Sequence, residues 1–406
     1  MGRIILFLMM LLPVLASAVE VTPLLDLRVR QELLDGVLHF APDPSANWIR
    51  MRTRAGVRTV AGAHRLELRL ANEHRHYLHP DTDFEWNEVI IDRALWAWTP
   101  DDATTLTAGR QNIIWPGGFL MLEGHPYDGS RSIYQNAVRL QHGSLDLAFI
   151  RNLKHDQWVL INDLQRPLQD MDETGIVLRS EHGGLSWAAI YKDESDPDLV
   201  LADLVTGTLG ARYERDGDDG GRLEAELAVQ FLRQKSGGDD GHQDATALAA
   251  QVFLTEPVGG GVRLEAGGFY YSGNSDKDWA GFRAPWGRWP KWSELYIYTL
   301  IGESTPGRVT VAAWENIAAP RLQCHIPVGT NLDGRCGLTY LLAPEPDWEP
   351  RGLLTQAELK ADLGGGLKGH LLWEMLVPGS FHDGRHNLAP LTDTVHFLRW
   401  QISWAL

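Results

Sequence analysis

Arginine recurs at alternate positions in the first part of the chain, which could place guanidinium groups side by side. Arg50, Arg52 and Arg54 are spaced by two residues, and the same spacing or a multiple of it links Arg28 with Arg30 and Arg65 with Arg69. A guanidinium stays ionised at any relevant pH and can hold a carboxylate through two hydrogen bonds, which lysine cannot do. Such a row would attract anions while holding each one weakly, as conduction through a pore requires.

Acidic residues interleave with these arginines and leave a second interpretation open. Asp26, Glu32, Glu67, Glu73 and Glu224 share the arginine pattern. If arginine and glutamate pair on neighbouring strands, the row becomes a set of wall charges without anion preference. The whole chain has 37 basic against 53 acidic residues and a net charge of −16. This balance excludes the basic surplus of a nucleic-acid-binding protein.

The elements that must carry these side chains are strands with two different faces. From residue 24 onward polar and apolar residues alternate with a period of two. Both a soluble β-sandwich and a transmembrane barrel give this pattern. The segments span about 10–13 residues, as spanning strands do, and their connections alternate between short and long. Aromatic residues also gather near segment ends, as at a membrane interface: Trp48, Trp96, Trp98, Trp187 and Trp404. These features favour the barrel.

The long connections give the strand number. Nine of them predict about 18 antiparallel strands, with short periplasmic turns and long extracellular loops. A barrel of that width encloses an aqueous channel unless it is plugged. We expect the loops at 113–132 and 272–316 to gate or constrict it. Residues 294–302 and 307–315 could form an extra hairpin inside the second loop.

The N-terminus predicts the compartment. Arg3 is followed by an apolar run over residues 4–15 and by Ala16-Ser17-Ala18, the pattern of a cleaved signal peptide. We therefore expect residues 1–18 to be removed and residues 19–406 to form a barrel in the outer membrane. No later run approaches the roughly 20 apolar residues of a spanning helix.

The two cysteines fall on one predicted hairpin. Cys324 and Cys336 are equally far from Thr330 and would face each other across the turn. Opposed side chains lie about 4.5–5.5 Å apart, close enough for a disulfide bond in an oxidising compartment. The alternative is two free thiols that face lipid. Either role is structural.

Several local motifs, in order, resemble the alginate-export outer-membrane porin family. They are residues 108–113 (AGRQNI), 128–132 (DGSRS) before 137–140 (AVRL), 271–274 (YSGN), 287–296 (GRWPKWSELY), 369–379, which begins GHL and ends VPG, and 396–400 (HFLRW). The resemblance covers most of residues 24–406 and implies an 18-stranded barrel that passes polymer or small solutes without chemistry. The terminal Leu406 departs from the aromatic residue that usually closes a barrel.

Taken together, these patterns predict an all-β, transmembrane antiparallel barrel that passes hydrophilic, anionic saccharide or polysaccharide. The alternative is a general or uptake porin without anion preference. The expected partners are outer-membrane lipid and lipopolysaccharide, the anionic saccharide or small hydrophilic solutes and, for export, periplasmic proteins. The expected lumen and pathway residues are Arg28, Arg30, Arg50, Arg52, Arg54, Arg65, Arg69, Arg110, Arg139, Glu67, Glu224 and Arg399.

No catalytic, cofactor or metal motif stands out in the sequence. The least favoured hypothesis is a barrel enzyme that modifies lipids. Its only loose candidates are Ser130 and Ser132 near His125, which the polar composition of a loop explains better. We therefore expect no enzyme activity, no cofactor and no resident metal.

Overall fold

The computed structural model describes residues 19–39, 41–81, 88–121, 134–162, 167–169, 171–198, 203–235, 242–273, 280–286, 292–298, 315–384 and 390–406. The expected signal peptide at 1–18 lies outside these residues, as do His125, Ser130 and Ser132. Across the described ranges, no helix has the length and apolar character needed to span a bilayer.

The described chain is almost entirely strand. The strands are β1 (Val19–Asp35), β2 (Ala46–Ala61), β3 (His64–His79), β4 (Glu88–Asp101), β5 (Thr104–Gln111), β6 (Gln135–His142), β7 (Leu145–Asn152), β8 (Val159–Asn162), β9 (Asp172–His182), β10 (Leu185–Ser195), β11 (Leu204–Asp216), β12 (Arg222–Lys235), β13 (His242–Gly259), β14 (Val262–Tyr271), β15 (Ile317–Gly329), β16 (Leu332–Ala343), β17 (Glu349–Gly364), β18 (Leu367–Pro378) and β19 (Val395–Ala405). Two short 3-10 turns, η2 (Pro116–Gly118) and η3 (Ser380–His382), lie in the long loops.

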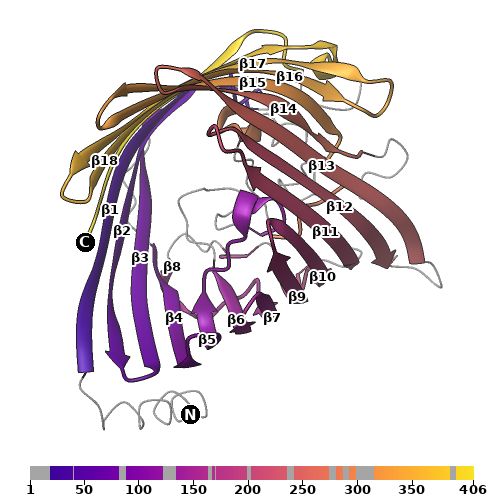
Figure 1. Cartoon of the computed structure of the whole chain (residues 1–406). Helices are drawn as coiled ribbons and strands as arrows, with labels where there is room; N and C mark the ends of the chain where they lie inside the picture. The colour runs from indigo at the N-terminus through magenta and orange to yellow at the C-terminus, as the bar shows by residue number, and fades with distance from the viewer. Residues whose placement is uncertain are drawn as a thin grey trace.

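The strands close into a barrel (Figure 1). Apart from β8, successive strands pair antiparallel, and β1 pairs with β19 to complete the wall. The short β8 pairs only with β4, while β7 pairs directly with β9. The closed wall therefore has 18 strands, which confirms the expected fold. Closure leaves no open sheet edge in the wall, a condition for β-structure inside a bilayer.

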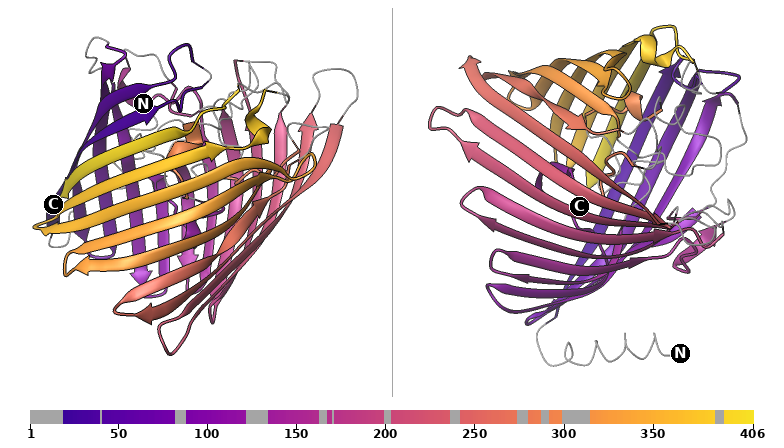
Figure 2. Two further views of the ribbon diagram at one scale, coloured as in Figure 1. Left: turned by 90° about the horizontal axis from the view of Figure 1, so that it is seen from above. Right: turned by 90° about the vertical axis from the view of Figure 1, so that its right-hand side faces the viewer.

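Short turns and long loops lie at opposite rims of the tilted strands (Figure 2). The short-turn rim carries tight hairpins such as the one after β2, where Gly62 has a φ of 56°. One expected feature is wrong: residues 295–298 form a helical turn and not the first arm of an extra hairpin. All four side chains are buried, so the run does not show the alternation of buried and exposed residues that a wall strand has. Residues 299–314, which include most of the second arm, lie outside the described residues.

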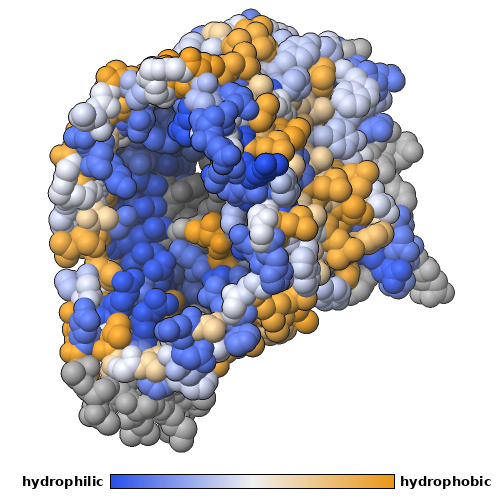
Figure 3. All heavy atoms as spheres, in the orientation of Figure 1, coloured by the Kyte–Doolittle hydropathy of each residue, from blue (hydrophilic) through white to orange (hydrophobic). Residues whose placement is uncertain are grey.

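The two faces of the wall are reversed relative to a soluble protein. On β11 and β12, Leu209 and Phe231 are 57% and 55% exposed, whereas Thr208 and Gln230 point inward and are 2% and 0% exposed. Figure 3 shows a hollow lined by hydrophilic residues and an outer surface with many hydrophobic ones. An apolar exterior around a polar interior is the arrangement that a bilayer requires.

Candidate functional site: the lumen

A segment of the β14–β15 loop crosses the lumen and is attached to the wall at both of its described pieces. We call residues 280–286 and 292–298 the crossbar. In the first piece, the Trp286 indole N–H donates to Glu173 on β9 at 3.0 Å. Lys192 on β10 forms an ion pair with the same Glu173 at 2.9 Å and donates to the Pro285 carbonyl at 2.7 Å. All of these side chains are buried, so the contact is a fixed anchor.

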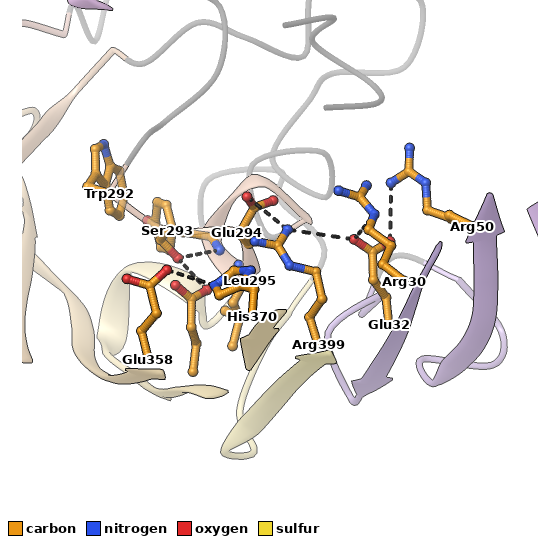
Figure 4. A network of polar contacts seen from close by, with 12 residues as sticks. Arg30, Glu32, Arg50, Trp292, Ser293, Glu294, Leu295, Glu358, His370 and Arg399 are labelled. Carbon is orange, nitrogen blue, oxygen red and sulfur yellow. Dashed lines mark hydrogen bonds and ion pairs between the residues drawn. The ribbon is translucent and has the colours of Figure 1, made fainter. Parts of the chain in front are cut away.

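The second piece of the crossbar is anchored on β18 (Figure 4). One carboxylate oxygen of Glu374 accepts hydrogen bonds from the Leu295 backbone N–H at 2.5 Å and from the Ser293 hydroxyl at 3.1 Å. Beside it, Arg399 on β19 pairs with Glu294 at 2.9 Å. In the strand order β9 and β18 lie on opposite sides of the barrel. The two anchors therefore tie the loop to opposite walls.

Aromatic side chains pack between the crossbar and the β14 wall. Phe119, Tyr271 and Phe282 stack with ring centroids 5.6–5.7 Å apart, and Phe269 lies 4.9 Å from Trp292. These rings belong to one continuous buried cluster inside the barrel. The two long loops were expected to gate or constrict the pore, and their described residues 113–121, 280–286 and 292–298 contribute side chains to this buried cluster. The aromatic cluster fills the β14 side of the lumen with apolar groups.

On the opposite side, the wall formed by β1–β4 carries more arginines than the carboxylates that pair with them. In the part of the chain that the structure describes, eight of these guanidinium groups form ion pairs with five carboxylates of the same strands. Asp92, for example, contacts Arg69 at 2.8 Å and Arg54 at 3.3 Å. The arginines are Arg28, Arg30, Arg50, Arg52, Arg54, Arg58, Arg69 and Arg93, and the carboxylates are Asp26, Glu32, Glu67, Glu73 and Asp92. We call this surface the basic wall.

A groove of about 190 Å³ opens along the basic wall towards the short-turn rim. Glu67 sits in it between Arg58 at 3.1 Å and Arg93 at 2.5 Å. The exposed Arg65 and, from β6, Arg139 add two further guanidinium groups. Neutral hydrogen-bonding groups complete the lining: Thr105, Thr107, Gln111, Asn112 and Gln141. The groove combines several cations with one carboxylate, which suits an anionic, hydrogen-bonding solute.

The wall across the barrel has the reverse ratio. On β11 and β12 two arginines, Arg212 and Arg222, share four carboxylates: Glu214, Asp216, Glu224 and Glu226. We call this surface the acidic wall. Residues 113–121 lie next to it: a Cβ added at Gly117 would come within 3.2 Å of Glu226. The acidic wall is thus partly covered, whereas the groove on the basic wall stays open.

Most of the predicted pathway residues lie together in the lumen. Arg28, Arg30, Arg50, Arg52, Arg54, Arg65, Arg69 and Glu67 belong to the basic wall, Arg139 to the groove, and Glu224 to the acidic wall. Arg399 instead holds the crossbar. Except for Arg65, every predicted arginine has an ion-pair partner, as the pairing interpretation expects.

Arg110 is a correction, because it does not face the lumen groove. Thr107 and Gln111 line that groove, and strand alternation puts Arg110 on the other face of β5. Its side chain is 1% exposed, lies 3.6 Å from the Tyr134 ring centroid and pairs with Asp156 of the β7–β9 connection. The residue fixes that connection to the wall.

Sequence reasoning missed the residues that depend on contacts between distant parts of the chain. Alternation places Arg58 on the face of Arg50, Arg52 and Arg54, although Arg58 was not among the expected pathway residues. Arg93 was missed, and a bulge between β3 and β4 shifts the register there. Glu173, Lys192 and Trp286 had no sequence signal, because their contact joins residues up to 113 positions apart.

The two cysteines are placed as expected. Cys324 on β15 is the direct register partner of Cys336 on β16. Both are free thiols in the structure. The disulfide bond therefore stays a prediction.

Solved structures with the same fold are outer-membrane porins. One is Pseudomonas aeruginosa OccK2 (OpdF) in complex with glucuronate, at 13% identity and a TM-score of 0.58, covering 95% of this chain and 96% of that one. A second is Acinetobacter baumannii OccAB1, at 10% identity and a TM-score of 0.60, covering 95% of this chain and 96% of that one. A third is Pseudomonas aeruginosa OpdK with vanillate, at 12% identity and a TM-score of 0.56, covering 95% of this chain and 98% of that one.

No family model matches the chain, and no curated protein sequence matches it. The resemblance to the alginate-export family is therefore not supported by these comparisons. At 10–13% identity the solved structures show the fold alone. The chain has the barrel of an outer-membrane porin.

Proposed function

We propose that this protein is a passive uptake channel of the outer membrane for small hydrophilic solutes, with a preference for solutes that carry a carboxylate. The observation that carries the proposal is the excess of arginine over carboxylate on the basic wall, next to the open groove. These ion-paired side chains still leave the wall positive, because four of the five carboxylates, all but Asp26, contact more than one arginine. Low-dielectric walls lined by one sign of charge raise the local concentration of the opposite ion.

The crossbar favours small solutes over a polysaccharide. It ties opposite walls together, and the aromatic cluster takes up the β14 side. A solute must therefore pass beside the crossbar, along the basic wall. The ligands of the two similar porins named above, glucuronate and vanillate, are small carboxylates of the kind that such a path would accept.

The test is the reversal potential of the purified protein in planar bilayers under a salt gradient, together with solute entry into proteoliposomes. We expect anion preference, and faster entry of glucuronate than of uncharged glucose at low salt. Conductance without anion preference would leave an unselective porin. A barrel that inserts but conducts nothing would contradict the channel itself.

A further inference from the structure

The two cysteines of the chain lie in one row on the outer surface of the barrel. The row crosses four strands in register, from Leu264 on β14 through Cys324 and Cys336 to Ala357 on β17. Neighbouring side chains on this face are exposed and apolar, with Leu322 and Leu338 47% and 48% exposed. The thiols thus face the same side as the lipid-facing residues.

We propose that Cys324 and Cys336 form a disulfide bond across the β15–β16 hairpin, and that it forms before the hairpin enters the membrane. Opposed side chains in a sheet have Cβ atoms about 4.5–5.5 Å apart, and a disulfide needs about 3.5–4.5 Å, so a small closing movement suffices. The proposal rests on the outer-membrane location and not on conduction.

The chemistry of thiol–disulfide exchange requires that the bond form before the hairpin enters the membrane. The thiolate of one cysteine attacks the disulfide of a protein oxidant, a mixed disulfide forms, and the second thiolate displaces the oxidant. The two thiols lose two protons, and two electrons reduce the oxidant to a dithiol. A thiolate is disfavoured in apolar surroundings. Oxidation is therefore fast only while the hairpin is in water.

The bond would fix the register of the β15–β16 hairpin, which follows a long loop. β15 begins at Ile317, after the loop that contains the crossbar, and a slip of one residue would turn every lipid-facing side chain of the hairpin inward. A cross-link between direct register partners excludes that slip. The closed loop is short, so little chain entropy opposes its formation.

The first experiment is an intact-mass measurement on protein extracted from outer membranes, denatured with iodoacetamide and without reductant. We expect a mass about 2 Da below that of the reduced chain, from two lost hydrogens, and no alkyl group. Cys324→Ser and Cys336→Ser should each gain one alkyl group. Two alkyl groups on the wild-type protein would overturn the proposal.

The second experiment tests the order. Reduced protein folded into detergent micelles and reduced protein in urea are each exposed to oxidised glutathione, and free thiols are counted over time. We expect rapid loss of thiols in urea and much slower loss in the folded barrel. Equal rates would overturn oxidation before insertion. Neither readout depends on whether the channel conducts.

Discussion

The basic and acidic walls are built from the same two residue types, yet they differ in ratio and in access. On β1–β4 eight arginines share five carboxylates, whereas on β11 and β12 two arginines share four. The groove opens along the first wall, and residues 113–121 lie against the second. Counting ion pairs would make the two surfaces equivalent, since both are well paired. The sign of the remaining charge and its access to solute separate them.

The largest expected effect is on stability, from removing a shared carboxylate on the basic wall. Asp92→Asn leaves Arg54 and Arg69, both largely buried, without their common partner. Breaking a buried ion pair from one side costs about 3–5 kcal/mol. We expect a loss of that order in the free energy of unfolding, measured by denaturant titration in detergent.

The matched change on the acidic wall is Glu224→Gln, whose side chain is 33% exposed. A solvated pair contributes about 0–1 kcal/mol, so this variant should unfold close to the wild type. Equal losses in Asp92→Asn and Glu224→Gln would show that the two walls are equally buried.

The next effect concerns the crossbar. Glu374→Ala removes the acceptor for Leu295, Ser293 and Gln356, and each buried donor left unsatisfied costs about 1–3 kcal/mol. We expect the second piece of the crossbar to leave the wall and the single-channel conductance to become larger and noisier. Glu374→Gln keeps one acceptor oxygen, so its single-channel conductance should lie between that of Glu374→Ala and that of the wild type. Unchanged conductance in Glu374→Ala would mean that the remaining contacts, among them the Arg399–Glu294 ion pair and the aromatic cluster, hold the crossbar without Glu374.

A smaller effect should distinguish the two walls by ion selectivity. Replacing Arg58, Arg65 and Arg93 together by Gln removes three cations from the groove, so the reversal potential should move from anion preference towards zero or beyond. Arg212→Gln with Arg222→Gln is the control on the covered wall. If the control shifts the reversal potential as much as the groove variant does, the path does not run along the basic wall.

The smallest expected effect is the salt dependence of the anion preference, which is measured on the wild-type protein. The Debye length is about 10 Å at 0.1 M salt and about 3 Å at 1 M, so charges in a water-filled path are screened as salt rises. We expect the anion preference of the wild type to fall over this range, as measured from reversal potentials at a fixed gradient ratio. A preference that is independent of salt would point to solute size instead of wall charge.

The sequence predicted the wall well and the interior poorly, for a physical reason. Alternation is a local signal, so it placed Arg50, Arg65 and Arg139 on the lumen face and put Cys324 opposite Cys336. The prediction was wrong at Arg110, which belongs to the motif at residues 108–113 but lies on the face of β5 that points away from the lumen groove. The crossbar lay beyond its reach, because Glu374 meets Leu295 across 79 positions and a loop carries no period.

The pairing of the first strand with the last has a consequence for biosynthesis. On one side of β1, residues 26–35 pair with residues 396–405 of β19, the last strand, while on its other side β1 pairs with β2. The wall closes through this pairing, and contacts between residues so far apart in the sequence are slow to form. A product truncated before β19 would expose the unpaired backbone of β1 and β18 to lipid, where nothing can satisfy it. β19 is therefore the strand whose pairing with β1 and β18 completes the wall.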